Sequence, residues 1–136
     1  MTAKEYLSQY GWAKKEIEIK RDEIEQLEAI AEYATPRGER GGSGYASDKV
    51  GSLAARIADE KNSLQQDVAA LLEMRDKIKS QIDEIDNNRY RMVLTERYIN
   101  CKQWENISAD AHYSLRAVLY IHRDAINEFG RRFLVE

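Results

Sequence analysis

The first third of the chain carries apolar residues at seven-residue intervals, and this spacing limits the possible folds more than any other feature. One series consists of Tyr10, Ile17, Ile24 and Ala31. A second series is offset by three or four residues and consists of Tyr6, Ala13, Leu27 and Ala34, with an interruption at Lys20. Two interleaved series form one apolar stripe along an α-helix, as in coiled coils. We therefore predict a helix over residues 3–34 that packs against another helix.

A second long helix is predicted over residues 48–86. Its unbroken seven-residue series is Val50, Ile57, Leu64, Leu71, Ile78 and Ile85, and the less regular partner positions are Leu53, Val68, Met74 and Ile82. At about 1.5 Å per residue, the two helices would be roughly 46 Å and roughly 58 Å long. Helices of similar length can pair as an antiparallel hairpin. Because a two-helix hairpin buries little apolar surface, we expect a homo-oligomer formed through this helical stem.

The segment between the two helices, residues 35–48, contains four glycines and the only proline of the chain. It lacks the Lys-Ser/Thr ending of a phosphate-binding P-loop, and no strand is predicted before it. A flexible connection is therefore the better interpretation. Ser47 or Asp48 is a suitable N-cap for the second helix.

Three shorter helices are predicted in residues 87–136, at about 89–99, 103–111 and 114–129. Asp86, Asn87 and Asn88 are capping residues that favour a break before them, and Ser114 is a good N-cap for the last helix. The turn before Ser114 is only His112-Tyr113. A short helix, a tight turn and a longer helix make a helix-turn-helix. The predicted fold is thus all-α, with a helical hairpin at residues 1–86 and a helix-turn-helix domain at 87–136.

The last helix of a helix-turn-helix lies in the DNA major groove, so its outward face carries the base contacts. If Val118, Ile121 and Ala125 point inward, the outward positions after the Ser114 cap are Leu115, Arg116, Leu119, Tyr120 and Arg123. Arginine can bond guanine or phosphate, and Leu119 and Tyr120 can contact a thymine methyl or the sugar backbone. Lys102, Gln103 and Arg123 are the candidate phosphate contacts.

The charge distribution is compatible with DNA contact only by the second half of the chain. The net charge of the whole chain is −3. Residues 1–86 carry 13 basic and 18 acidic side chains, a net charge of −5, whereas residues 87–136 carry 8 and 6, a net charge of +2. This mild asymmetry assigns any nucleic-acid contact to the C-terminal region.

The C-terminal segments 91–99, 104–108 and 114–126 together resemble region 4 of sigma-70 factors. They read Arg-Met-Val-Leu-Thr-Glu-Arg-Tyr-Ile, Trp-Glu-Asn-Ile-Ser, and Ser114 through Ala125-Ile126. With the heptad-rich front, the chain is similar to phage and prophage late-gene regulators of the ArpU/RinA type. The resemblance implies a phage transcription regulator that binds double-stranded DNA, with RNA polymerase as a further possible partner.

The sequence departs from the sigma pattern at four positions. Ser108 replaces a close-packed alanine, and His112 replaces a glycine in the turn. Leu115 and Leu119 stand where sigma factors tend to have arginine. Two other functions fit the same organisation: a DNA-packaging adaptor resembling a small terminase subunit, and an interaction module that contacts RNA polymerase.

Other classes of function find little support in the sequence. The single cysteine, Cys101, permits no disulfide within the chain, which is typical of a reducing compartment. The N-terminus has no apolar signal core, and the longest apolar run is only residues 68–72, so we expect a cytoplasmic protein. His112 and His122 have no partners at metal-ligand spacing. No catalytic constellation is evident, and we expect neither enzymatic activity nor a cofactor.

Overall fold

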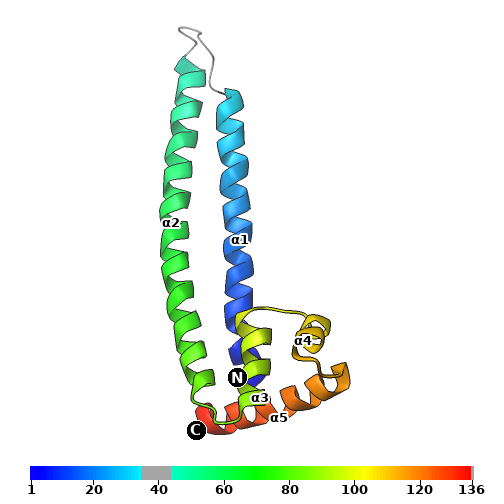
Figure 1. The fold of residues 1–136 in the computed structure, drawn as a ribbon. Coiled ribbons are helices and arrows are strands. Elements are labelled where there is room, and N and C mark those ends of the chain that lie inside the picture. Colours follow the sequence, from blue (N-terminus) through cyan, green and yellow to red (C-terminus); the bar gives the residue numbers. More distant parts are fainter. Residues whose placement is uncertain (35–43, 136) are drawn as a thin grey trace. The chain divides into compact units, whose positions relative to one another are not determined.

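The computed structural model describes residues 1–34 and 44–135. All regular structure in these ranges is helical, with no strand, which confirms the all-α prediction. The elements are α1 (Ala3–Ala34), α2 (Gly44–Asp83), α3 (Asn88–Leu94), a π-helical turn η1 (Thr95–Ile99), α4 (Trp104–Ala111) and α5 (Leu115–Phe133) (Figure 1).

The ends of α1 agree with the sequence prediction. The backbone N–H of Glu5 donates to Thr2 Oγ1, and the N–H of Thr2 donates to Glu5 Oε1, each at 3.1 Å. This reciprocal capping box satisfies two backbone donors that a helix start leaves unpaired, and it explains why α1 begins at Ala3.

The start of α2 differs from the prediction. The helix begins at Gly44 and ends at Asp83, so Ser47 and Asp48 lie inside it and the N-cap role predicted for either residue is wrong. Tyr45 and Ala46, which precede Ser47, are compatible with helical backbone, so the helix starts earlier. The presence of good capping residues at 47 and 48 does not by itself set the start of a helix. Residues 35–43 of the predicted flexible connection lie outside the described residues.

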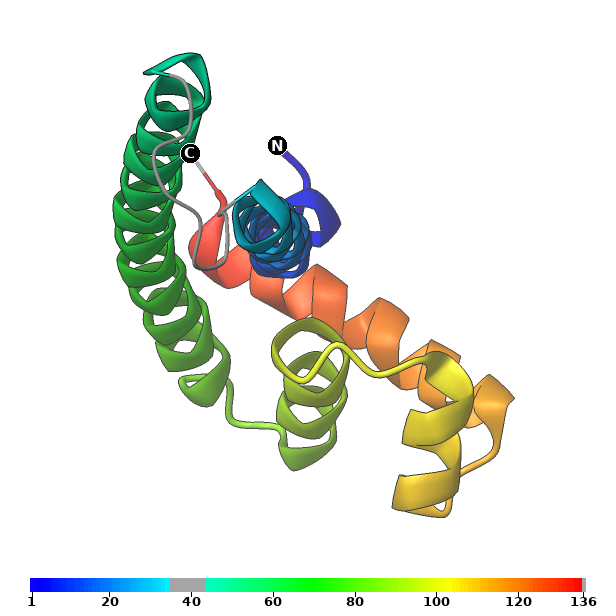
Figure 2. The same ribbon diagram turned by 90° about the horizontal axis from the view of Figure 1, so that it is seen from above.

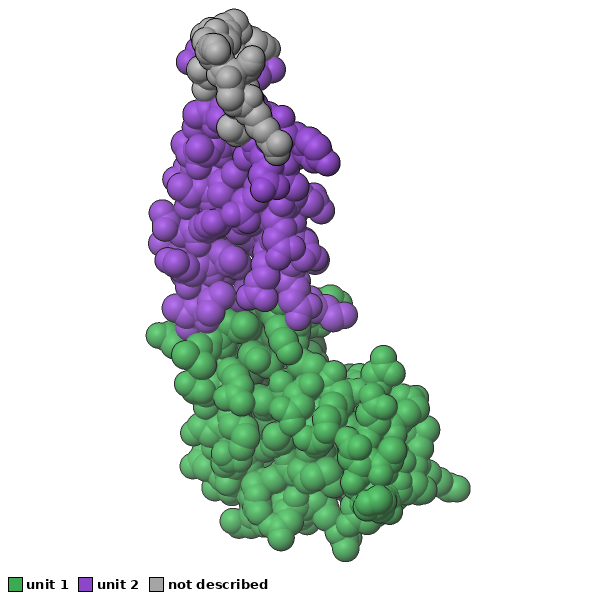
Figure 3. Space-filling view, turned by 45° about the horizontal axis from the view of Figure 1, so that its top comes forward, with its two compact units in different colours: residues 1–14, 71–136 green, residues 15–70 purple. Residues whose placement is uncertain are grey.

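The chain divides into two compact units, and their limits differ from the predicted boundary between residues 86 and 87. Unit 1 comprises residues 1–14 and 71–136, and unit 2 comprises residues 15–70 (Figure 3). The first turns of α1 and the last turns of α2 therefore belong with the C-terminal helices. The reason lies in the core of unit 1, which these helix ends complete.

The core of unit 1 joins α1, α2, α3 and α5. Its most buried members are at most 1% exposed and are Leu7, Ile78, Ile82, Ile85, Leu94, Ala125 and Phe129. The Tyr6 ring lies 5.8 Å from the Phe129 ring, and the Tyr6 hydroxyl donates to Gln81 Oε1 at 2.6 Å. The first turns of α1 lie beside α5, as Figure 2 shows, and a Cβ at Gly130 would lie 3.5 Å from Ala3 Cβ.

In unit 2, α1 and α2 run antiparallel, as predicted for the hairpin. Lys20 Nζ lies 2.9 Å from Asp67 Oδ2, and Lys61 Nζ lies 2.8 Å from Glu28 Oε2. Lys20 also donates to Ser63 Oγ at 2.5 Å. The residue that interrupts the apolar series of the first helix thus has polar partners on α2, and such a polar pair in an apolar seam favours one register.

Unit 2 corrects one predicted stripe position. Val68 was expected to contribute to the apolar stripe of α2, but it is 42% exposed. Leu64 is half-buried and Asp67 bonds Lys20, so these two positions, rather than Val68, face α1 at this level.

The helix predicted over residues 89–99 is divided into α3 and η1. The Asn87 side chain caps α3 by accepting from the N–H groups of Arg89 and Tyr90, at 2.9 and 3.1 Å. Two buried pairs, Val93-Leu94 and Tyr98-Ile99, are five residues apart. An α-helix would point residues five apart in different directions, whereas a π-helical turn with its i to i+5 bonding brings Leu94 and Ile99 toward the same core.

Candidate nucleic-acid interface

Helices α4 and α5 form the predicted helix-turn-helix within unit 1. The Ser114 hydroxyl accepts a hydrogen bond from the Ala117 N–H at 3.1 Å, which confirms Ser114 as the N-cap of α5. This bond satisfies one of the unpaired donors in the first helical turn. The cap fixes where α5 begins and therefore which side chains its first turns expose.

The turn between α4 and α5 involves two of the residues that depart from the sigma pattern, His112 and Ser108. His112 adopts the left-handed conformation, with φ 60° and ψ 33°, that glycine would adopt more easily. The Ser108 carbonyl accepts from the Tyr113 N–H at 3.2 Å, and the Ser108 hydroxyl donates to the Tyr113 carbonyl at 2.5 Å. An alanine at position 108 has no hydroxyl for the second bond. Ser108 thus closes the turn from the preceding helix.

A small apolar core holds α4 and α5 on α3. Val93, Ile107 and Val118 are at most 1% exposed, and Met92, Trp104 and Ile121 pack against them. The Trp104 ring is 4.5 Å from the His122 ring, and the Arg97 guanidinium lies 4.4 Å from the Trp104 ring centre. Through these contacts Trp104 packs within the module.

The outward side of α5 matches the prediction. Leu115, Leu119 and Tyr120 are 40%, 42% and 46% exposed, and Arg116 and Arg123 are exposed beside them. These five side chains, called here the α5 face, line a shallow hollow of about 430 Å³. The guanidiniums of Arg116 and Arg123 lie 5.7 and 5.0 Å from the Tyr120 ring centre, within cation–π range. The α5 face is therefore an apolar surface bordered by two positive charges.

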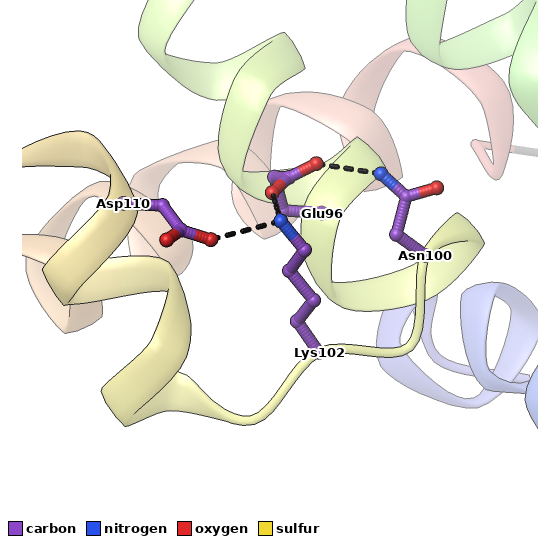
Figure 4. A network of polar contacts seen from close by, with 4 residues as sticks. All are labelled: Glu96, Asn100, Lys102 and Asp110. Atoms are coloured by element: carbon purple, nitrogen blue, oxygen red, sulfur yellow. Dashed lines mark hydrogen bonds and ion pairs between the residues drawn. The ribbon is translucent and has the colours of Figure 1, made fainter.

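Lys102, predicted as a phosphate contact, is already paired with two carboxylates (Figure 4). Its Nζ lies 2.5 Å from Glu96 Oε2 and 2.9 Å from Asp110 Oδ2. Hydrogen bonds to Glu96 and Asp110 raise the pKa of Lys102 above its usual value. A phosphate would have to compete with both carboxylates, so this geometry does not favour the predicted role. Gln103, the other candidate beside it, is exposed at the start of α4.

Arg89 is a candidate contact that the sequence reasoning missed. It is exposed, and its guanidinium lies 6.0 Å from the centre of the Tyr113 ring, directly before the Ser114 cap. Arg89 precedes Tyr113 by 24 positions. No local pattern relates the two residues, because only the packing of α3 on α5 brings them together.

His122, whose ring packs against the Trp104 ring, is held in its neutral form by its surroundings. His122 Nε2 and the Tyr98 hydroxyl are hydrogen-bonded at 2.6 Å. Burial, with the nearby charges of Lys4 and Arg97, lowers the pKa of His122 from 6.5 to about 4. Burial also raises the pKa of Tyr98 to about 12. Among the described residues, no three His, Cys, Asp or Glu side chains are grouped as metal ligands.

The His122 environment predicts a pH-dependent stability. The pKa of His122 is 6.5 in the unfolded chain and about 4 in the folded chain. As the pH falls below 6.5, the unfolded chain therefore binds a proton at His122 before the folded chain does. The stability that neutral His122 provides is therefore complete above pH 6.5 and decreases toward pH 4. We expect the Tm difference between the wild type and His122→Gln to shrink over this range. A difference that stays constant or grows in thermal melts would contradict this account.

None of the helices in the described part of the chain is long and apolar enough to cross a membrane. Comparison with known proteins found no matching family model, no matching curated protein and no matching solved structure.

Proposed function

We propose that this protein binds double-stranded DNA through the α5 face and acts as a phage-type transcription regulator. The observation that carries the proposal is the exposure of Leu115, Arg116, Leu119, Tyr120 and Arg123 along one side of a capped helix in a helix-turn-helix. A major groove about 12 Å wide admits an α-helix presented in this way.

The positive charges near the start of α5 support the proposal. Within the described residues, Arg89 and Arg116 form no ion pair, and the ion pair of Arg123 is with the neighbouring Asp124, at 3.3 Å. These guanidiniums can therefore bind phosphate without breaking a long-range ion pair. The N-terminus of α5 adds a partial positive charge to the same region.

Substitution of the two α5-face arginines tests the proposal. We expect Arg116→Ala and Arg123→Ala each to weaken binding to duplex DNA about 10-fold, which is the range of a good base or phosphate contact. Fluorescence anisotropy with a labelled random-sequence duplex at about 50 mM salt measures the effect. Arg132→Ala is the matched control, because it removes the same charge from an exposed site in the last turn of α5. Equal affinities for all four proteins would refute the assignment.

We also propose that the protein is a homo-oligomer, and unit 2 supports this. Among its described residues only Ile17 and Ile24 are buried, while Ile19, Ile30 and Tyr33 are 59%, 55% and 92% exposed. A two-helix hairpin with so small a core gains stability when another copy covers it.

The mass of the assembly in solution separates this function from DNA packaging. Light scattering should give a dimer or a small oligomer for a regulator. A ring of roughly eight or more subunits would favour the packaging adaptor, because such adaptors surround DNA.

A further inference from the structure

The apolar part of the α5 face has no evident use within the molecule. Leu115 and Leu119 lie four residues apart on the same side of α5 and are 40% and 42% exposed. They belong neither to the core of unit 1 nor to the small core under α4 and α5. Leucine forms no hydrogen bond to a base, so these two positions need an apolar partner.

We propose that Leu115 and Leu119 select thymine-containing DNA by packing against thymine C5-methyl groups. This inference rests on the proposed function. The methyl group of thymine is the apolar group that the base edges present in the major groove, and apolar side chains distinguish it from the polar edges of the other bases. The α5 face would thus recognise sequence through methyl contacts where a sigma-like helix would use charged side chains.

The spacing along α5 fits neighbouring bases. Residues four apart on a helix are separated by about 6 Å along its axis. Successive bases in one strand are about 3.4 Å apart, so Leu115 and Leu119 span about two base steps. The hollow of about 430 Å³ that they line with Tyr120 offers room for methyl groups between the side chains. The predicted target therefore contains two thymines within about two steps of each other.

The arginines on the same face favour DNA as the occupant over an apolar protein helix. Arg116 and Arg123 both lie within 6 Å of the Tyr120 ring and border the apolar surface. Phosphates line both edges of the major groove, so a helix seated there brings its flanking guanidiniums to negative charges. An uncharged apolar partner would offer no negative charge to these two guanidiniums.

The test uses the full-length protein and begins with selection of bound duplexes from a random pool. The selected duplex is then compared with the same duplex in which deoxyuridine replaces every thymidine. This change removes the C5-methyl groups and keeps the base pairs. We expect the deoxyuridine duplex to bind about 10-fold more weakly. Leu115→Ala and Leu119→Ala should bind the two duplexes with nearly equal affinity, whereas Val135→Ala, which truncates a residue 71% exposed outside the α5 face, should discriminate like the wild type.

Each outcome decides a separate point. Binding of both duplexes with equal affinity by the wild type would overturn thymine selection and leave the proposed DNA-binding function intact. Failure of the selection to enrich any sequence, with the random-sequence duplex still bound, would overturn thymine selection alone, whereas failure to bind any duplex would overturn both. If the leucine variants bind and discriminate DNA like the wild type but no longer capture purified RNA polymerase, the apolar surface is a protein contact and the thymine assignment is wrong. Circular dichroism confirms that each variant is folded, as expected for exposed side chains.

Discussion

A fragment consisting of residues 87–136 is expected to remain largely unfolded in isolation. The helix-turn-helix was predicted from the sequence as a separate domain, but its α5 packs in a core that also contains Leu7, Ile78 and Ile82. These three side chains are at most 1% exposed, and the fragment lacks all of them. Loss of a fully buried apolar side chain costs about 2–5 kcal/mol in the free energy of unfolding. The sum over three such side chains is comparable to the whole free energy of unfolding of a small domain.

The matched control keeps unit 1 and removes unit 2. In this control, residues 1–14 are joined to residues 71–136 through a short glycine-rich loop. We expect the control to show helical circular dichroism and one cooperative transition in urea, and the 87–136 fragment to show neither. Cooperative unfolding of the fragment with a stability close to that of the control would support the boundary between residues 86 and 87 instead.

Phe129→Ala should produce the largest loss of stability among single substitutions in unit 1. The Phe129 side chain is fully buried, and its ring lies 5.8 Å from the Tyr6 ring and 4.8 Å from the Phe133 ring. Truncation of a buried phenylalanine leaves a cavity and typically costs about 3–5 kcal/mol in the free energy of unfolding. Because Phe129 belongs to α5 and contacts Tyr6 of α1, its truncation should weaken the packing of both helices.

Urea denaturation of unit 1 and of the full chain measures this loss. Trp12→Ala is the matched control, since it truncates an aromatic side chain that is 66% exposed in the part of α1 that belongs to unit 1. Its effect should stay within about 0.5 kcal/mol. Comparable losses for the two variants would contradict the packing described for Phe129.

Local patterns in the sequence were sufficient to predict the helices but not their grouping. The seven-residue series located α1 from Ala3 to Ala34, and Ser114 fixed the start of α5. The series did not include Leu7, which is fully buried because it faces the C-terminal helices as well as α2. Contacts between residues far apart in the sequence decide such burial, and a periodicity within one helix does not report them.

In the candidate site, too, exposure along one helix was predictable from the sequence, whereas contacts between distant residues were not. The five residues of the α5 face were predicted correctly as exposed, because helical spacing determines the side opposite Val118 and Ala125. The environments of Lys102 and Arg89 were not predictable. Lys102 lies in the non-helical segment before α4, and its ion pair with Asp110 depends on how that segment folds back on α4. Arg89 contacts the Tyr113 ring because α3 packs on α5.

The salt dependence of DNA binding tests the central claim most directly. With Arg89, Arg116 and Arg123 on phosphates, about three counterions are displaced, and each contributes about −0.9 to the slope of log K against log salt concentration. We therefore expect a slope of about −2 to −3 for the full-length protein in anisotropy titrations between about 50 and 200 mM salt. Absence of binding at about 50 mM salt, or an affinity independent of salt, would contradict a DNA interface at the α5 face.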